Sequence, residues 1–250
     1  MSQPKERPIL FSAPMVRAIQ EGRKTVTRRP VKVRPFDLSW SRRDHRFEYT
    51  AGRAENGDEI DGFYAYSTRS GGEWSAKCPY GQPGDRLWVR ETWLPDPDAD
   101  HDAWYDHTET YYSWAGCGSK IKDVPPTLQN PGQCLYREGW EGGAMIWRPS
   151  IHMPRWASRI LLEITAVRVE RLRAGEGEAT HESRYVAEGV HRIHHGDGAY
   201  YFHPFNSDPG PGNWCDPFDA WRELWVSING ADSWNANPWV WVVEFKRVAP

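Results

Sequence analysis

The stretch ILFSAPMVRAIQEGRKTVTRR, Ile9–Arg29, has the pattern of a strand, a short helix and a second extended segment. Ser12 stands where a helix N-cap belongs, Pro14 falls within the first turn, and Gly22 follows the last apolar position as a C′ residue. This spacing predicts a helix over Ala13–Glu21, followed by a tight turn and a strand that contains β-branched residues.

The segment after the helix, GRKTVTRR, combines four cationic side chains with two threonines. In an extended chain, Lys24 and Arg28 lie on one side and Thr27 lies on the other. A turn at the start of the segment breaks this alternation, so the sequence alone leaves open which side chains face inward. An exposed basic turn without a ligand is the alternative to a binding site at this position.

Charge and composition exclude several classes of protein. A formal net charge of −3 argues against a protein that holds long duplex DNA by bulk electrostatics. No apolar stretch approaches the roughly 20 residues that span a bilayer, and the N-terminus lacks the apolar core of a signal peptide. We therefore expect a cytoplasmic protein without a membrane partner. Any contact with nucleic acid has to come from a local basic patch, or the ligand has to be small.

The cysteines form no CxxC pair, which predicts free thiols rather than disulfides in the cytosol. They are scattered along the chain as Cys78, Cys117, Cys134 and Cys215.

Six further segments carry strand or helix signals. A helix is expected to begin after Asp216, with Pro217 in its first turn, and to end at Gly230. A shorter helix is expected over Glu178–Ala187. Apolar and β-branched residues predict strands over Leu87–Trp93, Ala144–Arg148, Ser158–Leu172 and Asn237–Val248.

Five pieces of the sequence, taken in order, resemble the ASCH family, and they look most like the larger versions found in bacteria and their phages. The pieces are Ile9–Arg29, Pro83–Trp93, Arg159–Leu172, Tyr185–Val190 and Trp239–Val248. The resemblance implies a single α+β domain over residues 1–250 with a PUA-like (ASCH) mixed β-barrel and short flanking helices. Two long insertions, at about 35–80 and 94–143, have no counterpart in the minimal family members.

Two functional interpretations accompany this resemblance. PUA-like barrels commonly bind RNA or read modified bases, and a minimal ASCH member is an amidohydrolase that deacylates N4-acetylcytidine with a Lys, a Thr and a Glu. Carried over by motif, these residues are Lys24, Thr27 and Glu188, with Glu178 and Glu182 as neighbouring alternatives for the last. The implied partner is a nucleoside or nucleic acid, RNA in preference to DNA, and no cofactor is implied.

The three residue types suit amide hydrolysis, which needs a nucleophile, a base and a proton donor for the leaving nitrogen. Thr27 supplies a hydroxyl, and Lys24 can act as the base where burial and neighbouring arginines lower its pKa. Glu188, expected near the C-terminal end of a helix, would have its carboxyl pKa raised by the macrodipole, which suits a proton shuttle. A site that only binds would keep its cations and would not need Thr27.

Further ligand contacts are predicted on both sides of this segment. Arg23, Arg28 and Arg29 suit phosphates or base edges. Glu91 is expected to point inward from its strand, where it needs a partner. A structural ion pair with Arg28 or Arg29 explains that position as well as a ligand does.

Three more residues are predicted to contact a ligand. Trp93 at the end of its strand is a stacking platform or a plug of the barrel. His152 and Arg155 precede the strongest strand, where barrel loops often meet a ligand, and a connector with a turn set by Pro154 is the alternative. No metal site is predicted, because the histidine-rich loop fits no standard zinc spacing. Its histidines are His191, His194, His195 and His203.

Overall fold

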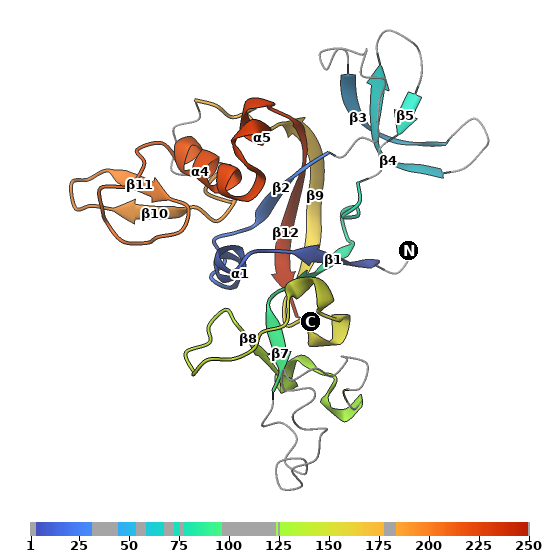
Figure 1. Ribbon diagram of the computed structural model, residues 1–250. Helices are drawn as coiled ribbons and strands as arrows, with labels where there is room; N and C mark the ends of the chain where they lie inside the picture. The colour runs from blue at the N-terminus through green and yellow to red at the C-terminus, as the bar shows by residue number, and fades with distance from the viewer. Residues whose placement is uncertain are drawn as a thin grey trace, which may run out of the picture. The chain divides into compact units, whose positions relative to one another are not determined.

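The computed structural model describes residues 4–31, 45–53, 59–67, 73–75, 78–96, 124, 126–177 and 184–249 (Figure 1). These residues form a mixture of helices and strands in which strands predominate, which confirms the α+β class. The chain divides into two compact units. The first comprises residues 1–21, 86–163 and 247–250, and the second comprises residues 22–85 and 164–246.

A mixed sheet runs through the first unit. There β1 (Glu6–Leu10) pairs in parallel with β6 (Arg86–Arg90), and β6 pairs antiparallel with the first residues of β9 (Leu161–Arg171). The second ladder places Leu87 opposite Leu162, and both side chains are fully buried. The alternation of apolar residues in both segments is what places these two leucines on the covered face.

Helix α1 (Ala13–Gln20) forms where the sequence predicts it. The carbonyl oxygen of Ser12 accepts the first helical hydrogen bonds, although the Ser12 side chain makes no capping bond. Gly22, at φ 74°, has the left-handed backbone that commonly follows a helix C-terminus. The apolar positions recur on one face and are buried, namely Met15, Val16, Ala18 and Ile19.

The rest of the first unit surrounds a two-stranded ladder between β7 (Trp93–Pro95) and β8 (Cys134–Tyr136). The strand predicted over Ala144–Arg148 is wrong, because only Arg148 forms an isolated bridge, with Trp93. Among the described residues, short 3-10 helices complete the connections, namely η4 (Pro126–Leu128), η5 (Pro131–Gln133), η6 (Ser150–His152) and η7 (Arg155–Ala157).

The second unit contains the rest of β9, which lies next to β12 (Trp239–Val248) in the sheet. On its other side, β12 pairs antiparallel with β2 (Val26–Pro30), so that Thr27 lies opposite Val243. The full strand order is β1-β6-β9-β12-β2. In the part of the chain that the structure describes, these strands do not close into a barrel.

Helix α4 (Pro217–Asn229) has the predicted signals at both ends. Asp216 Oδ1 accepts a hydrogen bond of 2.8 Å from Phe218 N, which is an N-cap, and Gly230 at φ 81° ends the helix. The short helix α5 (Ala231–Asn235) follows. The buried face of α4 is largely aromatic, with Phe218, Trp221, Leu224 and Trp225.

Two smaller sheets belong to the second unit. The hairpin of β10 (His191–His194) and β11 (Tyr200–His203) is extended by a bridge between Phe202 and Trp214. The first predicted insertion contains a three-stranded antiparallel sheet of β3 (His45–Arg53), β4 (Glu59–Ser67) and β5 (Glu73–Ser75).

The helix predicted over Glu178–Ala187 differs from what the structure shows. Residues 184–187 form turns, and residues 178–183, with the alternative carboxylates Glu178 and Glu182, lie outside the described residues. Within the described residues, no helix has the length and apolar character needed to span a bilayer. Cys78, Cys134 and Cys215 are free thiols, as predicted, and Cys117 lies outside the described residues.

Candidate functional site

Lys24 is positioned by backbone pairing between two distant segments of the second unit. Thr25 N and Val26 N both donate to the carbonyl oxygen of Ala187, at 2.9 and 3.1 Å. Lys24 and Glu188 form an isolated antiparallel bridge. Main-chain contacts therefore hold Lys24 opposite Glu188, although the two residues lie 164 positions apart in the sequence.

The Lys24 side chain is buried, and its ammonium group donates three hydrogen bonds. The acceptors are the carbonyl oxygens of Val26 and Glu188, both at 2.8 Å, and Glu188 Oε2 at 2.7 Å. These contacts use all three N–H bonds of an ammonium group. Lys24 must therefore pass a proton to an acceptor such as Glu188 before it can act as a base.

Glu188 lies between two cations. Its Oε2 accepts from Lys24, and its Oε1 accepts from Arg28 Nη1 at 3.0 Å. Since only 4% of Glu188 is exposed, its carboxylate has exchanged water for two charge-assisted hydrogen bonds. This arrangement fixes the orientation of both oxygens.

Arg28 is a buried member of the same cluster, with 1% of its side chain exposed. Its Nε donates to Glu170 Oε1 at 2.9 Å, and its guanidinium carbon lies 5.2 Å from the ring centroid of Tyr185 and 5.4 Å from that of Trp221. Arg28 Nη2 is buried and has no hydrogen-bond acceptor among the described residues, so the two aromatic rings supply the electrostatic contact on that side.

The four charges Lys24, Arg28, Glu170 and Glu188 form one connected set, which we name the Lys24–Glu170 cluster. Two of its members are cations and two are carboxylates. Glu170, on β9, also accepts hydrogen bonds from the less buried Arg168 and Arg184, at 3.3 and 3.2 Å. The cluster therefore links the loop at Glu188 to strands β2 and β9 within the second unit.

The pKa of Glu188 is shifted in the opposite direction from the one the sequence predicts. Burial raises the pKa of this carboxyl, but the charges and hydrogen bonds of Lys24 and Arg28 outweigh it, and the net pKa lies below the usual value. The residues just before Glu188 form turns rather than a helix end. Two cations at hydrogen-bond distance therefore determine its charge.

The pKa of Lys24 shifts in the expected direction. Burial lowers the pKa of the Lys24 ammonium, and the charges of Arg29 and Arg28 act in the same direction, whereas Glu188 raises it. The net pKa lies below the usual value of a lysine. Burial thus reduces the free energy needed to form the neutral amine.

Thr27 is buried on β2 but stands apart from the Lys24–Glu170 cluster. It alternates along the strand with Val26 and Arg28, so its side chain projects to the opposite face from that of Arg28. Its hydroxyl makes no hydrogen bond with Lys24 or Glu188 among the described residues. The structure thus brings together two of the three residues that the resemblance implies.

Arg23 and Arg29 flank the buried residues and are both half-buried. Arg23 Nη1 donates to the carbonyl oxygen of Gly189, directly after Glu188. Arg29 lies opposite Trp241 in the β2–β12 ladder. Of the three predicted arginines, these two are the ones with side chains near solvent.

Glu91, in the first unit, pairs with Arg159 rather than with the predicted Arg28 or Arg29. Arg159 Nε and Nη2 donate to the two Glu91 oxygens at 3.0 and 2.8 Å, in a bidentate contact. Arg159 also lies 4.0 Å from the ring centroid of Tyr136. Burial raises the pKa of Glu91 above its usual value, against the effect of Arg159.

Trp93 is completely buried and packs with Tyr136, Met153 and Ala157. Its ring meets that of Trp156 edge-on at 5.4 Å between centroids. Its indole nitrogen is buried and has no hydrogen-bond partner among the described residues. In this position Trp93 fills the core of the first unit.

His152 and Arg155 lie in the two 3-10 helices that precede β9. His152 is exposed, and Arg155 Nε donates to Glu6 Oε2 at 2.6 Å, in a largely exposed ion pair. In the part of the chain that the structure describes, no three His, Cys, Asp or Glu side chains are grouped as ligands for a metal ion.

Sequence analysis missed Glu170 and the aromatic pair of Tyr185 and Trp221. The one signal for Glu170 was a carboxylate near the end of a strongly apolar strand, where it needs a cation. Comparisons of the chain with protein-family profiles, with curated proteins and with solved structures give no match.

Proposed function

We propose that this chain has a PUA-like, ASCH-type fold, binds a modified pyrimidine nucleoside and hydrolyses an N4-acylcytidine amide. The observation that carries the proposal is the buried contact of 2.7 Å between Lys24 Nζ and Glu188 Oε2. The resemblance alone selected these two positions as the base and the proton shuttle. The two residues lie 164 positions apart in the sequence, and their contact supports the proposed pair.

The proposed acylation step uses the pair in its neutral form. Lys24 first passes a proton to Glu188. The Thr27 hydroxyl then attacks the acyl carbon and gives its proton through a relaying water molecule to the Lys24 amine, while the C–N4 bond breaks and Glu188 protonates the leaving nitrogen. The products are cytidine, an acyl ester on Thr27, and the pair in its ionic form.

The proposed deacylation step returns the pair to its neutral form. Water attacks the ester carbon and gives one proton to Glu188, and the Thr27 oxygen takes a proton from Lys24 through the relaying water molecule as the carboxylic acid leaves. Burial favours this cycle, because it lowers the pKa of Lys24 and so reduces the cost of the neutral amine. Arg28 stabilises the carboxylate of Glu188 between the two steps.

The test is incubation of the full chain with N4-acetylcytidine at high protein concentration and long times, with cytidine measured by chromatography. We expect cytidine to form, and Lys24→Met and Glu188→Gln to abolish its formation. Lys246→Met, which changes an exposed lysine on β12, is the matched control and should retain activity. Absence of cytidine with the unchanged protein would refute the proposal.

Thr27 needs its own variant, because its side chain projects away from Arg28. Thr27→Ser should retain activity and Thr27→Ala should lose it if Thr27 is the nucleophile. Retained activity in Thr27→Ala would mean that water attacks the acyl carbon directly and that no ester forms. Mass spectrometry of protein quenched during turnover detects the acyl group on Thr27.

A second candidate function, a module that binds RNA or a modified base without hydrolysis, is favoured by the three acceptors around Lys24. They give this side chain the surroundings of a structural ammonium group. Binding of an oligonucleotide would then weaken as salt increases and would survive Thr27→Ala. It would fall in Arg29→Gln, since Arg29 is only half-buried.

A further inference from the structure

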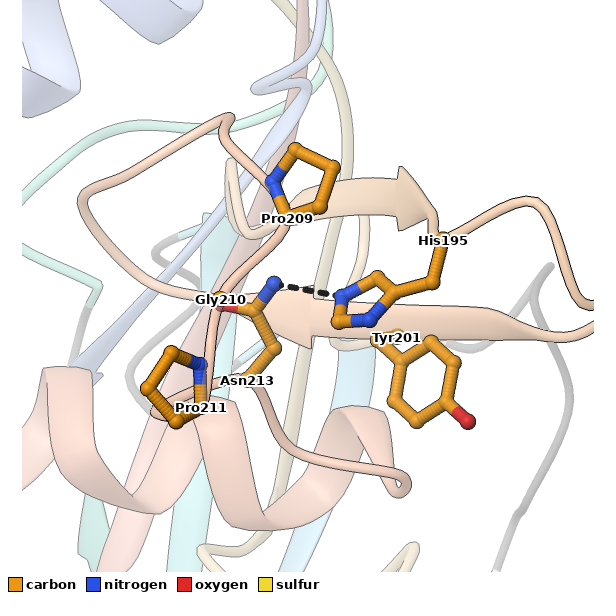
Figure 2. Close-up of a pocket in the computed structure, with 6 residues that line it drawn as sticks. All are labelled: His195, Tyr201, Pro209, Gly210, Pro211 and Asn213. Atoms are coloured by element: carbon orange, nitrogen blue, oxygen red, sulfur yellow. Dashed lines mark hydrogen bonds between the residues drawn. The ribbon is translucent and has the colours of Figure 1, made fainter.

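A cavity of about 490 Å³ lies in the second unit, and none of the four residues of the Lys24–Glu170 cluster is among its lining residues, which Figure 2 shows. One side comes from the β10–β11 hairpin and the other from the loop that precedes Trp214. The lining residues are His195, Tyr201, Pro209, Gly210, Pro211 and Asn213. The volume falls within the range of small-molecule sites, roughly 300–1,000 Å³.

Two aromatic rings and two prolines form most of the lining of this cavity. The rings of His195 and Tyr201 lie 4.1 Å apart between centroids and 31° from parallel. The rings of Pro209 and Pro211 come from the loop, and Figure 2 shows the Asn213 amide pointing from that loop toward His195. The two aromatic rings give the lining flat faces, which favour a planar ligand.

The hydrogen bonds around Asn213 determine which polar atoms are left for a ligand. Asn213 Nδ2 donates to the carbonyl oxygen of Asp208 at 3.1 Å, which only an amide nitrogen can do. The same nitrogen lies 2.8 Å from His195 Nε2, which must then accept, so the imidazole proton is on Nδ1. His195 Nδ1–H and Asn213 Oδ1 have no hydrogen-bond partner among the described residues.

The charges near the cavity are negative. The Tyr201 hydroxyl donates to Asp197 Oδ2 at 2.8 Å, and Asp208 adjoins the proline loop. In the described part of the chain, no lysine or arginine lines the cavity. The nearby Arg192 instead lies over Tyr200, with its guanidinium carbon 4.3 Å from that ring centroid. A phosphate group would therefore meet repulsion here.

We propose that this cavity binds the base of an unphosphorylated nucleoside. The base lies in the plane of the His195 ring and over the Tyr201 ring, and it uses its amide-type edge, one acceptor and one donor, toward His195 Nδ1–H and Asn213 Oδ1. Stacking on aromatic side chains accepts any base, because every base has a π-face. The site is separate from the proposed hydrolytic site and does not depend on it.

The experiment measures binding of cytidine, uridine and adenosine to the full chain by saturation-transfer NMR and calorimetry. We expect saturable binding that weakens about tenfold in Tyr201→Ala. Tyr201→Phe keeps the ring and should bind as the unchanged protein does. Tyr200→Ala, which changes the neighbouring residue on the opposite side of the hairpin, is the matched control and should also bind normally. Thermal unfolding of each variant verifies that it is folded.

Further binding measurements distinguish this proposal from its alternatives. Cytidine 5′-monophosphate should bind more weakly than cytidine, and binding of cytidine should persist in Lys24→Met. Persistence there, without any hydrolysis of N4-acetylcytidine by the unchanged protein, would support this cavity while refuting the proposed function. The proposal is overturned if nucleosides do not bind saturably, if Tyr201→Ala binds them normally, if the monophosphate binds more tightly, or if only a proline-rich peptide binds.

Discussion

At the scale of single residues, the charge of Glu188 depends on Lys24 and Arg28, which contact one oxygen each. Removing one member of a buried ion pair costs more than the pair contributes, because the remaining charge stays desolvated. Substitutions in this cluster should therefore act on stability as well as on any activity.

Arg28→Met tests this cost. It removes the cation between Glu170 and Glu188, and we expect a loss of about 3–5 kcal/mol in the free energy of unfolding. Urea unfolding followed by circular dichroism measures the loss. Arg168→Met is the control, because Arg168 also contacts Glu170 but has a side chain that is 40% exposed. Its loss should stay below about 1 kcal/mol, and equal losses in the two variants would contradict a buried cluster.

The pKa of Glu188 predicts how stability depends on pH. Its folded pKa lies below the 4.5 of an ordinary glutamate, so the unfolded chain takes up the proton first as pH falls. The stability that Glu188 contributes is present above that value and is lost as pH falls through the folded pKa. The free energy of unfolding should therefore decline less steeply on acidification in Glu188→Gln than in the unchanged protein. Equal slopes would contradict the lowered pKa.

Glu91 provides a control, because its pKa is shifted in the opposite direction from that of Glu188. Its pKa is raised above 4.5, so its contribution is present below that value and is lost as pH rises through the folded pKa. In the unchanged protein, the contribution of Glu91 to stability grows as pH falls and offsets part of the acid destabilisation. The free energy of unfolding of Glu91→Gln lacks this contribution and should decline more steeply on acidification just above pH 4.5. A flatter profile would contradict the raised pKa.

The GRKTVTRR segment predicted only some residues of the Lys24–Glu170 cluster, because a sequence motif is a local pattern. Lys24 was found because it stands in a recognisable segment, and Glu188 was found only through the resemblance. Glu170 was missed because its partner Arg28 lies 142 residues away, and no local pattern pairs them. The position of Thr27 was left open because the alternation of a strand applies only after the strand has begun.

At the scale of elements, helices with capping signals were predicted well and isolated apolar runs were not. α1 and α4 carry their start and stop signals within a few residues of each end. The run Ala144–Arg148 has apolar residues, but among the described residues it pairs with a strand only at Arg148, and Ile146 is 68% exposed. Which strand pairs with which is a tertiary property, so the choice of Arg159 as the partner of Glu91 was not readable from either segment.

Asp216→Ala measures how much the N-cap stabilises α4. We expect it to lower the free energy of unfolding by about 1 kcal/mol, because Phe218 N loses its acceptor. Asp219→Ala is the control in the same helix turn. Asp219 forms only a partly exposed ion pair with Arg222, so its loss should be no more than about 0.5 kcal/mol. A larger effect at Asp219 would mean that charge, and not capping, dominates at this end.

At the scale of the whole molecule, the sequence predicts a single domain, whereas the chain divides into two compact units. Each unit contains a buried thiol. Cys134 belongs to the first unit and Cys78 to the second, while Cys215 is exposed. Burial raises the pKa of Cys134 to about 12, which suppresses its reaction as a thiolate. The thiols therefore report separately on the unfolding of each unit.

Alkylation in increasing urea, with peptides mapped by mass spectrometry, tests whether the units unfold together. Cys215 should react in the native protein, and Cys215→Ser should remove that signal. Cys78 and Cys134 should become reactive at the same urea concentration, because β9 contributes residues to both units. Two separate midpoints would show that the chain contains two independent folding units and would contradict a single domain.

The Lys24–Glu170 cluster also has a consequence for how this sequence can diverge. Its two cations and two carboxylates balance, so a change at one position leaves a buried charge that a change at another of the four positions compensates most directly. Positions 24, 28, 170 and 188 should therefore vary together among relatives of this chain, whatever those relatives bind. A relative that keeps both glutamates and carries a neutral residue at position 28 would have to recruit a new cation from elsewhere in its fold.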